Sequence, residues 1–179
     1  MNRKISGMLL AGGVASLSSA GFAQAQEFAA RLTGFEELGG LNAETGAILS
    51  NGKGTLSLDV DKSQITYTLT YSGLSAPATQ SHIHLGKLHV PGGIMVFFCT
   101  NLGNGPAGTP ACPASGGTVT GTWTAASVVG PTAQNVTPGD FSAIISALNS
   151  NTAYANIHTT KFPAGEIRGQ VRRGDREDN

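Results

Sequence analysis

Two neighbouring segments with a strict alternation of apolar and polar residues constrain the fold of this chain more than any other feature. In GTLSLDVD the two leucines and Val60 alternate with polar residues, and SQITYTLTY continues the pattern with every second residue apolar. A period of two is typical of a β-strand that buries one face. Only residues 61–63 separate the two runs, so we predict a β-hairpin at this point.

Six further segments have the composition of short strands bounded by turn residues: FAARLTGFEE, QSHIHL, IMVFFC, GTVTGTWTA, AYANIHT and GEIRGQVRR. Eight short strands favour an all-β fold, which we predict to be an antiparallel, Greek-key-like β-sandwich or barrel. Residues 140–151 differ, because their apolar residues recur at helical spacing. We predict one short crossover helix there, with Asp140 as its cap.

The N-terminal segment has the pattern of a secretory signal peptide. Arg3 and Lys4 precede an apolar stretch, and an A-x-A cleavage site follows. We therefore expect residues 1–25 to be a signal peptide, residues 26–173 one β domain and residues 174–179 a charged, disordered tail. The expected location is secreted or periplasmic. No later apolar run has the length that a membrane-spanning helix needs.

Charge and cysteine content limit the partners and the redox chemistry. Basic and acidic residues are equal in number, 11 of each, which argues against nucleic acid as a partner because nucleic-acid binding favours a basic surface. Cys99 and Cys112 are the only cysteines and flank the Gly/Pro-rich stretch TNLGNGPAGTPA. In an oxidising compartment such a pair most simply forms a disulfide, with a thiol or metal role as the alternative.

Three histidines occupy positions from which they can act together. If Ile83 and Leu85 face the core, His82 and His84 both point to the opposite face of their strand. The alternation in AYANIHT places His158 on a polar strand face as well. If the two strands are neighbours, the three imidazoles converge, and a set of imidazoles suits copper or zinc. The alternative is that each histidine only forms ordinary hydrogen bonds.

Other polar residues have weaker claims to a role. His89 lies among turn-forming residues and is a lesser candidate for a fourth ligand. Glu166 and Arg168 fall on the polar face of the last strand, where we expect a cross-strand ion pair or a hydrogen bond between Glu166 and a histidine, which would orient the imidazole. Glu36 and Glu37 are expected to be exposed carboxylates at a strand end.

Three segments, in this order, resemble the landmarks of the CHRD (chordin) domain: FAARLTGFEE, SHIHLG and ANIHTTKFPAGEIRGQV. This module occurs in chordin and in many exported bacterial proteins. The last segment is the most specific, with a His-Thr pair followed by Pro-x-Gly-Glu-Ile-Arg-Gly-Gln. The resemblance covers roughly residues 27–173. It implies a Greek-key-like β-sandwich outside the cytoplasm, but no agreed activity for the bacterial members.

The sequence gives little support to an enzymatic reading. The H-x-H strand is similar to that of copper/zinc superoxide dismutase, but four histidines in total cannot build that two-metal site. Neither a G-x-S-x-G elbow nor a phosphate-binding glycine loop is present. We predict a non-enzymatic, exported binding module for an unidentified protein, glycan or metal ligand. The alternative is a copper- or zinc-binding protein that uses His82, His84 and His158 and has a minor redox activity.

Overall fold

The computed structural model describes residues 26–38 and 46–174. Its strands are β1 (Gln26–Thr33), β2 (Lys53–Val60), β3 (Ile65–Ser72), β4 (Ala78–Leu85), β5 (Gly93–Thr100), β6 (Gly117–Trp123), β7 (Ala153–Thr159), β8 (Ile167–Gln170) and β9 (Arg172–Arg173). The helix α1 spans Phe141–Asn149, and three 3-10 turns are η1 (Gly34–Glu36), η2 (Ala125–Ser127) and η3 (Thr132–Gln134). The predicted signal peptide and residues 175–179 of the predicted tail lie outside the described residues.

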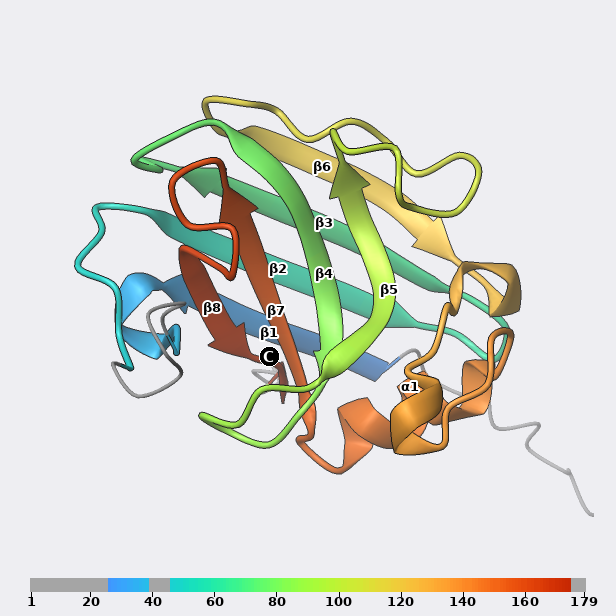
Figure 1. Ribbon diagram of the computed structural model, residues 1–179. Helices are drawn as coiled ribbons and strands as arrows, with labels where there is room; N and C mark the ends of the chain where they lie inside the picture. Colours follow the sequence, from blue (N-terminus) through green and yellow to red (C-terminus); the bar gives the residue numbers. More distant parts are fainter. Residues whose placement is uncertain (1–25, 39–45, 175–179) are drawn as a thin grey trace, which may run out of the picture.

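The strands form one antiparallel sheet that folds over into two layers. Their order is β5-β4-β7-β8-β1-β2-β3-β6, and β9 pairs with β1. Figure 1 shows β4, β5, β7 and β8 in front of β1, β2, β3 and β6. Two side chains link β3 and β6, at one end of the sheet, to β5 at the other end: the Tyr67 hydroxyl donates to Phe98 O (3.0 Å) and the Trp123 indole donates to Phe97 O (2.8 Å). The nearly closed, barrel-like all-β fold confirms the predicted class.

The alternation seen in the sequence becomes the inner face of the back layer. The β2–β3 hairpin pairs in register from Lys53 opposite Ser72 to Val60 opposite Ile65. Leu58, Ile65 and Leu69 are at most 1% exposed, whereas the polar residues between them face solvent. Each such aliphatic side chain contributes about 1.5–3 kcal/mol on burial. The core between the two layers is therefore fixed by strand periodicity.

The predicted helix and disulfide are both present. The Asp140 carboxylate caps α1 by accepting the Ala143 N–H at 3.1 Å. Cys99 and Cys112 form a disulfide. The loop that it closes lines a hollow of about 250 Å³ together with Tyr67, Phe97 and Trp123, so this part of the loop lies against the core aromatic residues of β3, β5 and β6.

Two strand boundaries differ from the prediction. The segment predicted as one strand from Phe28 to Glu37 ends at Thr33 and continues as the turn η1. The C-terminal segment divides into β8, which pairs with β7 on one side and with β1 on the other, and β9, which pairs with β1. Between them the Val171 N–H still donates to Ala153 O at 2.9 Å. The segment predicted as one strand is thus interrupted at Val171, while both of its parts keep β1 as a neighbour.

Candidate functional site

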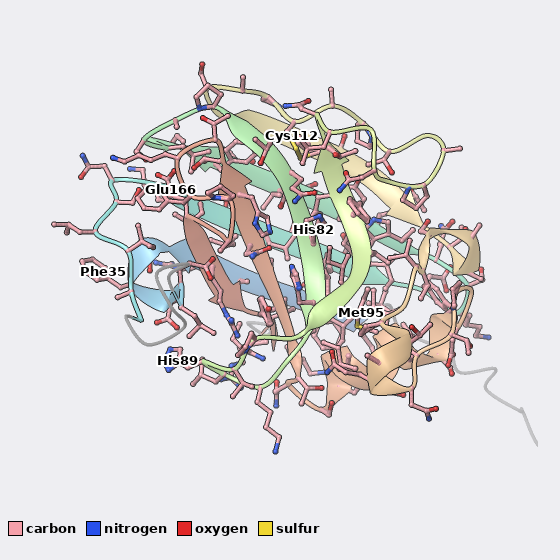
Figure 2. All side chains as sticks on the ribbon, viewed as in Figure 1. Phe35, His82, His89, Met95, Cys112 and Glu166 are labelled. Carbon is pink, nitrogen blue, oxygen red and sulfur yellow. A yellow bond between two sulfur atoms is a disulfide. The ribbon has the colours of Figure 1, made fainter. Side chains whose placement is uncertain are left out.

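Three of the predicted site residues meet on the outer face of the front layer. β4 and β7 are antiparallel neighbours, with His82 opposite Asn156 and His84 opposite Tyr154. One nitrogen of each of His82, His84 and His158 lies within 4.8 Å of the other two. Figure 2 places His82 between β4 and β7 near the middle of this layer. The pairing of the two strands, which the sequence left open, is what brings the histidines together.

The histidines are not on a wet face. His82 is fully buried, and His84 and His158 are each 7% exposed. Three segments outside the strands reach this surface: residues 34–38, 86–92 and 160–166, which we call the covering segments. They contribute the Glu37 side chain and the carbonyl oxygens of Gly92 and Pro163. The polar strand face that carries these histidines is therefore covered, because these loops fold back over the sheet.

Two carbonyl oxygens fix the tautomers of two histidines. The Nδ1 of His84 donates to Gly92 O at 2.8 Å, and the Nδ1 of His158 donates to Pro163 O at 2.8 Å. A neutral imidazole that is protonated on Nδ1 carries its lone pair on Nε2. Both Nε2 lone pairs are thereby directed into the cluster. Metal-binding histidines commonly use their second nitrogen in this way.

His82 is the third member of the cluster, and its ring also contacts β5. Its Nδ1 lies 3.2 Å from the Nε2 of His158. Its ring packs edge-on against Phe97, with centroids 4.4 Å apart. The Nε2 of His82 has no hydrogen-bond partner among the described residues, although it is buried. A buried polar atom without a hydrogen-bond partner destabilises the fold, and such atoms in native proteins often have a functional role.

The surroundings keep all three imidazoles neutral. Burial, reinforced by His158 and His84, lowers the pKa of His82 to about 2. Burial likewise lowers the pKa of His84 to about 4, although the Gly92 carbonyl opposes this shift. The pKa of His158 is also lowered, again chiefly by burial. Each ring therefore offers a free lone pair at neutral pH, which is the form that binds metals.

Asn156 and Tyr154, two residues that the sequence did not single out, line the same site. The Oδ1 of Asn156 lies 3.1 Å from the Nε2 of His84 and 3.1 Å from the Nε2 of His158. The Tyr154 ring stacks on the His84 imidazole, with centroids 4.8 Å apart and planes within 2°. The signal that could have found them is their position in AYANIHT, since both share the strand face of His158.

Arg168 supports the site from β8. It donates to the carbonyl oxygens of Lys87 and Val90, at 3.2 and 3.0 Å, and so ties one covering segment to the sheet. Its guanidinium also lies over the Tyr154 ring. Glu37, which is buried at 5% exposure, acts electrostatically on this guanidinium. The expectation that Glu37 is an exposed carboxylate is wrong, because the chain turns inward after η1.

The remaining predicted residues lie away from the cluster. Glu166 accepts hydrogen bonds from Ser50, Ser75 and Thr159, so the predicted contact with a histidine is replaced by contacts with hydroxyl and amide donors. His89 is exposed in a covering segment and lies 3.0 Å from Glu36. Figure 2 shows His89 on its loop, well apart from His82. It is therefore not a fourth member of the cluster.

The fold and the site define a class of protein: a small antiparallel β domain with one disulfide and a buried cluster of histidines on the outer face of one layer. A family model described as the CHRD domain matches residues 28–171. The chain belongs to the CHRD domain family, as its three sequence landmarks predicted, and this family consists of binding modules. Neither a curated protein nor a solved structure gives a significant match. Among the described residues, no helix has the length and apolar character needed to cross a membrane.

Proposed function

We propose that this CHRD domain is an exported, non-enzymatic binding module that holds one zinc or copper ion through His82, His84 and His158. The observation that carries the proposal is the pair of Nδ1 hydrogen bonds to Gly92 O and Pro163 O. They commit two buried histidines to the tautomer in which both Nε2 atoms face the same small space. Simple strand histidines have no need of that shared orientation.

The distances within the cluster suit a small ion with nitrogen ligands. With zinc-to-nitrogen bonds of about 2.0 to 2.1 Å, tetrahedral ligands lie about 3.3 to 3.4 Å apart. The His82 Nδ1 and the His158 Nε2 are 3.2 Å apart, and one nitrogen of each of the three rings lies within 4.8 Å of the others, so small side-chain movements bring the three nitrogens to this spacing. Imidazole ligands suit zinc and copper in particular. Because the three imidazoles are already neutral, metal binding does not have to displace a proton from an imidazolium.

The depth of the site supports binding over catalysis. The three histidines are at most 7% exposed, so a substrate has no direct route to an ion held among them. A catalytic metal keeps an open position that faces its substrate. The disulfide and the family support an extracellular setting, where such a module acts outside the reducing cytoplasm.

Calorimetric titration of the purified protein with Zn(II) and with Cu(II) tests the proposal. We expect one ion to bind per chain. His82→Leu should abolish tight binding. It should still fold, because the ring packs on Phe97 and its one hydrogen-bonding contact, at Nδ1, is with another proposed ligand, His158. His89→Asn is the matched control, since it removes a histidine outside the cluster and asparagine tolerates the φ of 56° found there. Equal binding by His82→Leu and the native protein would refute the proposed site.

A further inference from the structure

We infer that Asn156 supplies a fourth ligand through its Oδ1 and thereby closes the coordination shell of the metal. This inference rests on the proposed function and deepens it. It identifies the donor set as three imidazole nitrogens and one amide oxygen. It also states that the bound ion has no position left for an outside ligand.

The first argument is the place of Asn156 in the sheet. It lies directly opposite His82 across the β4–β7 ladder and two residues before His158 on β7. Side chains at those positions share one face of the sheet. The three histidines and Asn156 therefore form a compact group from two adjacent strands, and Asn156 is 2% exposed.

The second argument is a shortage of hydrogen atoms between close acceptors. The Oδ1 of Asn156 lies 3.1 Å from the Nε2 of His84 and 3.1 Å from the Nε2 of His158. Both Nε2 atoms carry lone pairs, because the Nδ1 protons of these rings are donated to carbonyl oxygens. An amide oxygen is also an acceptor. The Nδ1 of His82, 3.2 Å from the His158 Nε2, can supply one hydrogen to this group. The His84 Nε2 and the Asn156 Oδ1 still face each other as two acceptors, and a cation between them satisfies both lone pairs.

The third argument is that a neighbour sets the orientation of the amide. Burial raises the pKa of the Glu37 carboxyl, and the nearby Asn156 side chain counteracts this shift, so the amide presents its donor side toward Glu37. Only the Nδ2 group can donate, so the Oδ1 is left to face the histidines. Glu37 is held in turn by the Leu38 N–H, which donates to its Oε1 at 3.1 Å. It also packs against Gly165, where an added Cβ would collide with its Oε2.

The chemical consequence follows from the number of ligands. Four protein ligands in tetrahedral arrangement are typical of closed zinc sites, whereas three ligands leave room for water or substrate. With Asn156 in place, the ion is retained and shielded, and small anions cannot bind it. Glu37 acts as a positioning residue, because it holds the amide in the orientation that presents oxygen to the ion.

The experiment uses Co(II), a coloured substitute for Zn(II), and azide as a probe of open coordination positions. The visible spectrum of the Co(II)-loaded native protein should not change when azide is added. Asn156→Ala should bind Co(II) at least about 10-fold more weakly and should show a new band with azide. Glu37→Gln should weaken metal binding about 10- to 100-fold, as outer partners of ligands commonly do.

The double variant Asn156→Asp/Glu37→Gln exchanges the positions of the carboxylate and the amide. The amide at position 37 can then donate to the carboxylate at position 156. The double variant should restore the closed, azide-insensitive spectrum and bind the metal at least as tightly as the native protein, which loss of structure alone cannot produce. An azide-sensitive native spectrum, or identical spectra for the native protein and Asn156→Ala, would overturn this inference while leaving the three-histidine site intact. Absence of metal binding by the native protein would overturn both proposals.

Discussion

The guanidinium carbon of Arg168 lies 3.3 Å from the centroid of the Tyr154 ring, and that ring stacks in turn on the imidazole of His84. Arg168 is 2% exposed and also holds two carbonyl oxygens of the covering segment 86–92. A single buried cation thus connects β8, the loop over the site and the ring next to a proposed ligand.

Replacement of Arg168 should therefore destabilise the fold. Arg168→Ala removes two charge-assisted hydrogen bonds and a cation–π contact, and we expect a loss of about 3 kcal/mol in the free energy of unfolding. Arg168→Lys should recover only part of this, because an ammonium cannot reproduce the planar stacking of a guanidinium. Urea unfolding measures both variants. Arg31→Ala, on the exposed face of β1, is the control, and an equally small effect at both positions would contradict this role.

Glu166 should make the stability of the domain depend on acid. Burial tends to raise its pKa, but hydrogen bonds from Ser50, Ser75 and Thr159 outweigh burial and hold the pKa below its ordinary value of 4.5. A lowered pKa in the folded state means that the stabilisation is present above pH 4.5 and is lost as the pH falls through the folded pKa.

Glu166→Gln should accordingly cost about 2 kcal/mol at neutral pH and less in acid, where the native carboxylate is itself protonated. Unfolding followed between neutral pH and pH 3 compares the two proteins. Asp59→Asn, which changes an exposed carboxylate of β2, should leave the pH profile almost unaltered. A constant difference between native protein and Glu166→Gln at every pH would argue against a buried, ionised Glu166.

The disulfide should stabilise the domain through the loop that it closes. Cys99 and Cys112 are 13 residues apart, and by the chain-entropy estimate a loop of this length contributes about 3 kcal/mol. The double variant Cys99→Ala/Cys112→Ala should unfold at correspondingly lower denaturant concentration. A reducing agent should shift the native protein toward the variant and should leave the variant unchanged. An unaltered midpoint in the double variant would show that the loop needs no covalent closure.

Metal binding should raise the thermal stability in a way that depends on the three histidines. A ligand that binds only the folded state at 100 times its dissociation constant stabilises it by about 2.7 kcal/mol. We expect Zn(II) to raise the melting temperature and a chelator to reverse the shift. The single tryptophan, Trp123, is buried and reports unfolding by fluorescence. His82→Leu should give no shift with Zn(II), and a shift equal to that of the native protein would place the ion elsewhere.

Sequence periodicity was sufficient for the fold and for the candidate ligands. The alternation around Leu58 and Leu69 identifies the core face, and the same rule assigns His82, His84 and His158 to one kind of face. Each of these inferences depends only on neighbours in the chain. They required no knowledge of which strands pair.

The burial and the support of the site were not accessible to the same reasoning. They depend on loops that return over β4 and β7, and on contacts between residues far apart in the chain. The partners of His84 and His158 are the carbonyl oxygens of Gly92 and Pro163, which any residue type would supply. Glu37 was misassigned for a related reason, since its burial arises from the turn that follows β1. Residue type alone carries no trace of either arrangement.

The most direct test of the central claim is X-ray diffraction from crystals of the protein grown with Zn(II), recorded on both sides of the zinc absorption edge. We predict one anomalous peak per chain, between the Nε2 atoms of His84 and His158 and the Nδ1 of His82. A peak only at a surface position, such as the exposed pair His89 and Glu36, or no peak at the cluster, would contradict the metal-binding function.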